Sequence, residues 1–293
     1  MPQIEIEPEK GPVLLIDTSY YIFYRYFATY NWYRRQSSTP DEIDASNIMN
    51  DPVFMNTYQK MFEKTLMNIV KANKIKHMAN IIFVKDCSRD NIWRHQHFDG
   101  YKAGREDKTR TFNRDIFGYT YNTLISQLKE KIGFQTLNHN CLEADDVAAI
   151  VTNAILDNYH GANIIIITND NDYIQLLNHE AIVNREITGS KLRICNLQDK
   201  NICERVGCTP LEYISVKKII GDKSDNIPSI IKKCGDKTAL KLATNKHLLA
   251  ELLAKDPTAR LNYERNELLI DFSMIPEIYC DEVRQKISII KST

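Results

Sequence analysis

Residues 164–172 read IIIITNDND: four isoleucines in a row, followed at once by amides and acids. An unbroken run of β-branched residues suits a central strand buried on both faces, because a half-exposed strand would alternate polar with apolar residues. Asp170 and Asp172 then follow the carboxyl end of that strand. Parallel sheets bind their ligands outside this edge. The stretch therefore predicts an α/β fold with a site beyond the end of a buried strand.

Other apolar runs of the chain have the same form. Residues 13–16 (VLLI) run into Asp17, residues 81–84 (IIFV) end just before Asp86, and residues 133–137 are a weaker strand candidate. The segments between these runs have the apolar spacing of helices. Strands that alternate with helices predict a mostly parallel central sheet flanked by helices.

One of the predicted helices begins with a dense group of acids. Its apolar residues repeat at helical spacing over 144–155, and Gly161 follows as a stop signal. Glu143, Asp145 and Asp146 place three acids in four positions at its start. A helix N-terminus tolerates negative charge, which is one explanation. Three acids exceed what capping requires, so we expect metal ligation.

The acids that follow predicted strands, or begin or flank predicted helices, form one set. They are Asp17, Asp86, Glu143, Asp145, Asp146, Asp170, Asp172, Asp222 and Asp225. Carboxylates gathered at one sheet edge repel one another unless cations lie between them, and oxygen ligands suit divalent cations. Two such cations at one site indicate phosphodiester chemistry. Residues 168–172 lack the glycine and the later glutamate of an EF-hand and follow a strand, so a metal site at the sheet edge fits better than an EF-hand. An Asx-rich turn is the alternative.

The pattern changes to short helices after about residue 200. Residues 214–220, 237–243 and 247–254 are the best candidates, and GDKSDNIP at 221–228 lies in a lysine-rich stretch. Two helices joined by a glycine-containing turn can present backbone N–H groups to a phosphate. Such a segment suits the backbone of duplex DNA, and a solvated basic helix is the alternative.

Residues 93–105 interleave aromatic and basic side chains. This combination suits single-stranded nucleic acid, because rings stack on bases while cations hold phosphates. His95 and His97 are expected to be surface histidines, since their spacing puts them on different faces of a helix. Residues 28–57 are predicted to form a long polar loop or insertion, and residues 181–187 and 191–195 a hairpin.

Composition limits the class of protein. The 293 residues are 43% hydrophobic and 26% charged, as in ordinary soluble globular proteins. No stretch approaches the ~20 apolar residues of a membrane span. The seven cysteines form no CxxC motif, which favours reduced thiols in an intracellular protein. The net charge is zero, but with the nine acids set apart from 38 acids and 38 bases the remaining surface carries about +9, which is compatible with a polyanion.

The ordered set of motifs resembles the flap endonuclease/5′-3′ exonuclease family, which includes phage nucleases and the nuclease domain of bacterial DNA polymerase I. The matching motifs are Leu15-Ile16-Asp17, Asp86, Trp93-Arg94, Tyr101-Lys102-x-x-Arg105, Glu143-Ala144-Asp145-Asp146, Asp170-x-Asp172 and the GDKSDNIP string. The resemblance covers roughly residues 11–245. It implies a PIN-like or resolvase-like nuclease core over 11–200 with an arch at 92–118, and a helical, helix-hairpin-helix-like DNA-binding module with a C-terminal extension over 201–293.

The resemblance also implies roles for individual residues. Asp17, Asp86, Glu143 and Asp145 match the acids around a first metal, and Asp146, Asp170, Asp172 and Asp225, with Asp222 close by, match those around a second. The catalytic basic residues would be Lys102, Arg105 and Arg94, the first two at the scissile phosphate. The DNA contacts would be Tyr101, Lys223, Gly235, Lys237, Thr238 and Lys241. The implied cofactors are two Mg²⁺, for which Mn²⁺ can substitute, and K⁺ at the helix-hairpin-helix-like module.

The expected function is a structure-specific, metal-dependent DNA nuclease of replication or repair, acting as a 5′-3′ exonuclease or 5′-flap endonuclease. Its expected partner is DNA with 5′ flaps, nicks or ends, and a polymerase or sliding clamp is the candidate protein partner of an expected monomer. A viral source fits as well as a cellular one. The alternatives are a 5′-3′ exoribonuclease of related fold, a non-catalytic DNA-binding module and a phosphatase-like hydrolase.

Overall fold

The computed structural model describes residues 4–39, 43–104, 112–177, 182–188, 191–196 and 208–290. For residues 183–188 and 191–196 it describes the backbone alone. Several parts of the sequence predictions therefore lie outside the described residues. These are Arg105 with the rest of segment 105–111 inside the predicted arch, residues 40–42 of the predicted loop, residues 181 and 189–190 of the predicted hairpin, and residues 201–207 and 291–293 of the predicted C-terminal part.

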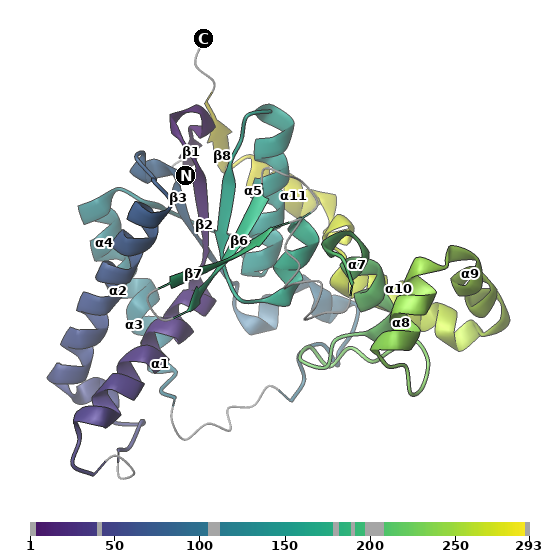
Figure 1. The fold of residues 1–293 in the computed structure, drawn as a ribbon, viewed down its shortest axis with the longest axis horizontal. Coiled ribbons are helices and arrows are strands. Elements are labelled where there is room, and N and C mark those ends of the chain that lie inside the picture. The colour runs from purple at the N-terminus through teal and green to yellow at the C-terminus, as the bar shows by residue number, and fades with distance from the viewer. Residues whose placement is uncertain are drawn as a thin grey trace.

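A six-stranded sheet in the order β4-β3-β2-β5-β6-β7 forms the centre of the molecule (Figure 1). Its strands are β2 (Val13–Asp17), β3 (Ile81–Lys85), β4 (Gln135–Asn138), β5 (Ile164–Ile167), β6 (Ile182–Thr188) and β7 (Lys191–Asn196). β2 pairs in parallel with both β3 and β5, and only the β6–β7 hairpin is antiparallel. The predicted mostly parallel sheet is confirmed, and its carboxyl ends meet at one edge.

The apolar runs are continuous because alternate residues of each strand enter two different cores. On one face, Leu14 and Ile16 pack with residues of α1 (Thr18–Gln36), α2 (Pro52–Ala72) and α4 (Ile125–Ile132). On the other, Val13 and Leu15 pack with α5 (Ala144–Asn158) and α11 (Glu277–Arg284). Both faces of the sheet are thus covered by helices, as Figure 1 shows.

The prediction of a long polar loop over 28–57 was wrong for much of that span. α1 continues to Gln36, and α2 already begins at Pro52. Tyr26 and Tyr30 are buried, and their stacked rings extend the apolar face of α1 into a segment whose arginines had indicated a loop. Arg34 and Arg35 lie in the last turn of that helix, where cations are favoured.

The C-terminal part is helical, as predicted. α7 (Pro210–Ile220) leads through the GDKSDNIP segment to α8 (Asp236–Thr244), followed by α9 (Lys246–Lys255), α10 (Pro257–Ile270) and α11. α8, α9 and the N-terminal end of α10 project to one side of the sheet in Figure 1. β8 (Ile287–Ile289) then pairs in parallel with β1 (Ile4–Ile6), which joins the two ends of the described chain.

Several short elements complete the described chain. They are the 3₁₀ helices Pro8–Lys10, Ile48–Asn50, Met78–Asn80, Arg89–Asn91, Trp93–Gln96, Asn171–Leu176 and Phe272–Met274, the α-helix α3 (Asp115–Tyr119) and a π-helical turn at Thr120–Leu124. Among the described residues, no helix has the length and apolar character needed to cross a membrane.

Candidate active site

The carboxyl edge of the sheet brings together acids that are distant in sequence. Asp17 is the last residue of β2, Asp86 follows β3, Asp170 follows β5, and Asp145 lies in the first turn of α5. These four, named here the strand-end acids, line one cavity of about 880 Å³. The parallel pairing of β2 with β3 and β5 places the strand ends side by side, which is the arrangement expected from the sequence.

Asp17 is held at the start of α1. Its Oδ1 accepts a hydrogen bond from the backbone N–H of Tyr20 at 3.1 Å, and its Oδ2 accepts one from the Thr168 hydroxyl at 3.0 Å. Burial, reinforced by the charge of Asp86, raises the pKa of Asp17 to about 7. The carboxylate is therefore fixed in orientation, but its ionised form is poorly stabilised by the protein alone.

The pKa values of Asp86 and Asp145 are raised as well. Asp86 accepts hydrogen bonds from the Ser19 hydroxyl and from the backbone N–H of Ala144, the latter at 2.8 Å, yet burial still raises its pKa. Burial and the neighbouring Asp146 raise the pKa of Asp145. Among the described residues, no basic side chain forms an ion pair with Asp17, Asp86 or Asp145. Uncompensated charge of this kind indicates a place for cations.

Tyr173 is a second polar group of the cavity whose hydrogen-bonding capacity is unused within the described chain. Its side chain is 1% exposed and lines the same cavity, and within the described chain its hydroxyl has no hydrogen-bond partner. Burial, followed by the charges of all four strand-end acids, raises its pKa well above the ordinary value. A buried hydroxyl without a partner is costly, so this corner of the cavity fits a ligand or hydrated ion.

Glu143 lies at the same edge but has its own cations. It accepts hydrogen bonds from the Tyr101 hydroxyl at 2.8 Å and from Arg94 at 3.0 Å, and Lys102 forms an ion pair with its other oxygen. Burial opposes its ionisation, but Lys102 and Arg94 outweigh burial and lower its pKa to about 2. Glu143 is thus ionised and already paired.

Arg94 and Asp146 form a buried bidentate pair beneath the cavity. The side chains are 2% and 0% exposed, with nitrogen–oxygen distances of 2.6 and 2.8 Å, and Trp93 Nε1 donates to Asp146 at 3.1 Å. Arg94 Nε donates to the Leu269 carbonyl at 2.7 Å. Neither residue lines the cavity. The catalytic role of Arg94 and the ligand role of Asp146 stay predictions. Asp146 pairs with Arg94, yet one carboxylate oxygen from each of Glu143, Asp145 and Asp146 lies within 4.8 Å of the others, so these three could hold a metal ion.

A second group of acids lies beside the first. One carboxylate oxygen from each of Asp172, Asp222 and Asp225 falls within 4.8 Å of the others. We name these the Asp225 acids. The GDKSDNIP segment presents two of them because Asp222 and Ile227 exchange backbone hydrogen bonds of 2.9 and 2.7 Å, which closes a tight turn. Gly221 begins that turn at φ +76°, and a Cβ there would clash with the Ile227 carbonyl oxygen.

Lysines from the protein already lie among the Asp225 acids. Lys217, in the last turn of α7 and 6% exposed, forms ion pairs with Asp172 and with Asp222, the latter at 2.7 Å. Burial opposes ionisation of Asp222, but Lys217 outweighs it and lowers the pKa. Lys102 Nζ lies 3.7 Å from Asp225, and the Lys102 backbone N–H donates to the Asp225 carbonyl at 2.8 Å.

The predicted DNA contacts divide by exposure. Those in and after the GDKSDNIP segment are exposed: Lys223, Gly235, Lys237, Thr238 and Lys241. Tyr101 is only 3% exposed and packs with Ile92 and Ile227, while its hydroxyl donates to Glu143 and Asp225. The ring is part of an apolar cluster, and the DNA contact by Tyr101 stays a prediction.

The division of the acids also differs from the prediction of two sets of four. Asp170 lines the cavity with Asp17, whose pKa it helps to raise, while Asp172 lies with Asp222 and Asp225. Sequence reasoning did not single out Ser19 or Tyr173 as site residues. Ser19 lies two residues after Asp17, and Tyr173 directly follows Asp172, so closeness to a predicted ligand was the available signal.

Comparisons with known proteins agree with this geometry. The family model described as the 5′-3′ exonuclease, N-terminal resolvase-like domain, matches residues 12–207. The chain is 30% identical over 232 residues to a 5′-3′ exonuclease of Buchnera aphidicola subsp. Acyrthosiphon pisum, covering 79% of this chain and 70% of that protein. It is 24% identical to DNA polymerase I of Lactococcus lactis subsp. cremoris over 269 residues, covering 91% of this chain but only 28% of the polymerase.

Among solved structures, the fold is similar to that of the T5 D15 protein co-crystallised with metal ions. The TM-score is 0.62 at 17% sequence identity, covering 94% of this chain and 97% of the phage protein. A T5 D15 flap endonuclease pseudo-enzyme–product complex with DNA and metal ions gives a TM-score of 0.64 at 18% identity. At this identity the likeness concerns the fold alone.

Proposed function

Since this chain belongs to the 5′-3′ exonuclease family, we propose that it is a metal-dependent DNA nuclease acting at junctions between single-stranded and duplex DNA. It hydrolyses phosphodiester bonds as a 5′-3′ exonuclease and flap endonuclease. The observation that carries the proposal is the group of strand-end acids: four carboxylates that line one cavity, three of them without a basic partner among the described residues. A binding module would gain nothing from such repulsion.

The donor set fits two divalent cations. The strand-end acids, with Glu143 at their border, supply oxygen ligands for one, and the Asp225 acids supply them for the other. Mg²⁺ is the expected ion and Mn²⁺ a substitute. When bound, two such ions activate a water and neutralise charge at the attacking and leaving oxygens of a phosphodiester.

The side chains of this protein have distinct proposed tasks. Lys102 lines the cavity, and its ammonium is anchored by Glu143, so it is placed to offset charge on a phosphoryl oxygen. Arg94 acts as a positioning residue that holds Glu143 and Asp146 from beneath. Arg105 lies outside the described residues, and its proposed contact with the scissile phosphate rests on the motif it shares with Lys102.

The exposed lysines that follow α7 suit the backbone of duplex DNA. Lys223 belongs to the turn that carries Asp222 and Asp225, and Lys237 and Lys241 lie on α8. Contacts to phosphates there would position the duplex without reading its sequence. The same turn would couple duplex binding to assembly of the Asp225 acids. K⁺ before α8, the arch over 92–118, monomeric action and a polymerase or clamp partner stay predictions.

The test uses Asp170→Asn and Asp172→Asn with 5′-flap, nicked and blunt duplexes, in Mg²⁺ and in EDTA. Each variant should retain DNA binding in Ca²⁺ and lose Mg²⁺-dependent cleavage, because one anionic ligand is removed while the basic surface is kept. Asp157→Asn, on an exposed part of α5, is the matched control and should cleave normally. Undiminished cleavage by either site variant contradicts the proposal.

An RNA flap of identical geometry separates the remaining alternative. A DNA nuclease should cleave the DNA flap and leave the RNA flap, whereas an exoribonuclease would show the reverse preference. The comparison requires only the wild-type protein and substrates that differ in the sugar of the flap strand.

A further inference from the structure

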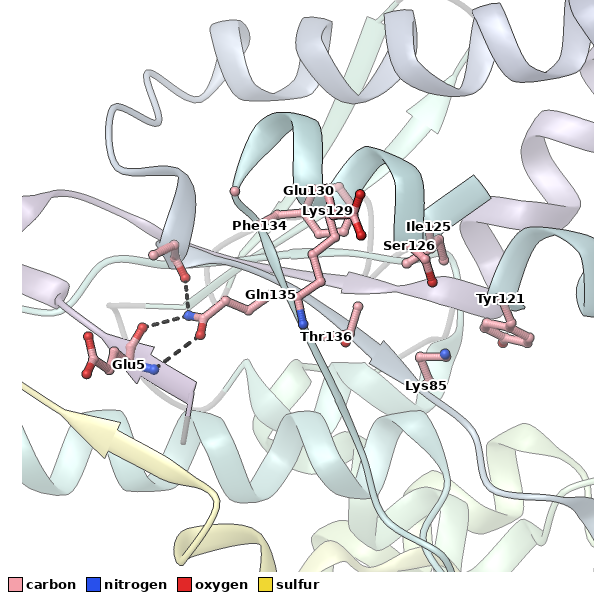
Figure 2. Close-up of a pocket in the computed structure, with 12 residues that line it drawn as sticks. Glu5, Lys85, Tyr121, Ile125, Ser126, Lys129, Glu130, Phe134, Gln135 and Thr136 are labelled. Atoms are coloured by element: carbon pink, nitrogen blue, oxygen red, sulfur yellow. Dashed lines mark hydrogen bonds between the residues drawn. The ribbon is translucent and has the colours of Figure 1, made fainter. Parts of the chain in front are cut away.

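A second cavity, of about 650 Å³, lies between α4 and the edge strand β4 (Figure 2). Lys85, Tyr121, Ser126, Lys129 and Thr136 line its part nearest the carboxyl edge of the sheet, and Glu5 lies at its far end. We name this cavity the β4 groove. None of the residues predicted from the sequence as site residues lines it.

Two lysines line the β4 groove. Lys85, at the end of β3, lies with its ammonium 4.7 Å from the centre of the Tyr121 ring, and Lys129 reaches from α4 toward β4 (Figure 2). Within the part of the chain that the structure describes, neither lysine is in an ion pair, although Glu5 and Glu130 line the same groove. The pair fits an anion, as the strand-end acids fit cations.

The β4 groove is connected to the candidate active site. The Tyr121 hydroxyl lies 3.0 Å from the Ser19 hydroxyl, which in turn donates to Asp86. Ser19 lines the active-site cavity and Tyr121 lines the groove, so these two side chains form the wall between them. Lys85 directly precedes Asp86 in the chain. An anion in the groove would therefore be a close neighbour of a phosphodiester at the strand-end acids.

The position of the groove indicates which strand it could hold. α4 and α8 lie on opposite sides of the sheet in Figure 1, with the carboxyl edge between them. A duplex seated on the exposed lysines of α8 would not also cover the groove. A strand that continues beyond the active site would reach it.

We propose that the β4 groove is a phosphate subsite for the 5′ single strand, with Lys85 and Lys129 as its cations and the Ser126 hydroxyl as a neutral donor. This inference rests on the proposed nuclease function, since it assigns the strand on one side of the same active site. The subsite holds phosphate and reads no base. It draws the 5′ strand along β4, away from the duplex.

The test measures DNA binding of Lys129→Gln in Ca²⁺, by fluorescence anisotropy, with the matched control Lys131→Gln. Lys131 is on the same helix but pairs with Glu63 of α2. Lys129→Gln should weaken binding to a duplex with a long 5′ flap several-fold and leave a flapless nicked duplex unchanged. The slope of log K against log salt on the flap substrate should fall by about 0.7, the value for one single-strand phosphate contact.

Neutral methylphosphonates placed one at a time along the flap locate the contact. At one flap position the substitution should weaken binding by wild type and have no further effect on Lys129→Gln, because both changes remove the same interaction. Equal binding by Lys129→Gln and Lys131→Gln overturns the inference. Equal losses on flap and flapless DNA overturn it as well, since they would indicate general charge attraction.

Cleavage by the wild-type protein separates this inference from the proposed function. If wild type cleaves flaps and Lys129→Gln binds them normally, only the subsite is wrong. If wild type cleaves no DNA in Mg²⁺ or Mn²⁺, the proposed function fails, and the binding comparison still decides whether the groove holds a single strand.

Discussion

The strand-end acids and the Asp225 acids lie side by side, but they differ in whether basic side chains of the protein form ion pairs with them. Among the strand-end acids, burial and neighbouring carboxylates raise the pKa values of Asp17, Asp86 and Asp145. Among the Asp225 acids, Lys217 and Lys102 already supply positive charge, and the pKa of Asp222 is lowered. The contrast indicates that external cations are essential to the first group, whereas in the second an arriving cation must compete with a lysine.

The largest expected effect is on catalysis. Asp86→Asn removes an anionic ligand that forms no ion pair with a basic side chain of the described residues, so cleavage in Mg²⁺ should fall on the order of 10³-fold or more. Asp222→Asn, in the lysine-paired group, should cost less. Single-turnover cleavage of a 5′-flap substrate measures both. Equal losses in the two variants would remove the contrast between the groups.

A large effect on stability is expected at the buried Arg94–Asp146 pair beneath the active-site cavity. Arg94→Gln leaves Asp146 buried without its cation, which should cost about 3–5 kcal/mol in the free energy of unfolding. The control is Arg284→Gln, whose half-exposed ion pairs with Glu277 and Asp281 should contribute less than about 1 kcal/mol. Urea denaturation measures both. A cost for Arg94→Gln no larger than that of the control would show that Asp146 is not desolvated.

The raised pKa of Asp17 predicts how stability depends on pH. Its pKa is about 7 in the folded protein and 3.8 as a model value, so between these values the folded state retains a proton that the unfolded state has released. This contribution to stability is full below pH 3.8 and is lost as the pH rises through 7. In EDTA, Asp17→Asn should therefore melt at the same temperature as wild type near pH 4 and at least roughly 2–4 °C higher at pH 8.

The effect of Mg²⁺ on the melting temperature gives a second test of the raised pKa of Asp17. Because the ligand must be ionised to bind a cation, Mg²⁺ should raise the melting temperature of wild type more at pH 8 than at pH 5.5. Thermal denaturation followed by circular dichroism gives both comparisons. An identical pH dependence in wild type and Asp17→Asn would contradict the assignment of the raised pKa to this residue.

The smallest expected effect concerns Lys217. Its removal in Lys217→Gln frees Asp172 and Asp222 from their internal cation, so Mn²⁺ should bind the Asp225 acids more tightly, by up to about tenfold or 1.4 kcal/mol. Calorimetric titration with Mn²⁺ measures the change. Lys218→Gln is the neighbouring control, because Lys218 pairs with Glu267 and Asp271 instead. Unchanged or weaker Mn²⁺ binding in Lys217→Gln would show that the lysine does not compete.

Much of the site could be predicted because it follows from strand ends. A buried parallel strand has a recognisable apolar run, and the residue after it must lie at the carboxyl edge, so Asp17, Asp86 and Asp170 needed no tertiary information. The acids of α5 were recognisable in the same way, as an excess over what a helix N-terminus requires. The GDKSDNIP turn was readable because Gly221 and the short polar residues leave few other conformations.

Other features could not be predicted, because side-chain direction depends on neighbours distant in sequence. Arg94 was predicted as a catalytic residue and Tyr101 as a DNA contact, and the sequence did not reveal that Asp146, Glu143 and Asp225 bind them inside the protein. Residues 28–36 were predicted as part of a loop because they are polar. They form a helix in which Tyr30 is buried by tertiary packing. Pattern alone cannot tell a basic or aromatic side chain that awaits a ligand from one that is already paired.

The sequence by itself determined the parallel sheet, the edge at which the acids gather and the family, because apolar periodicity and strand ends are local properties of the chain. Only the tertiary structure decided which acids are compensated. Whether a carboxylate keeps its charge depends on burial and on cations a few ångströms away, and Lys217, Lys102 and Arg94 reach their acids from separate elements. For the same physical reason, only the folded molecule shows that Lys85 and Lys129 line one groove.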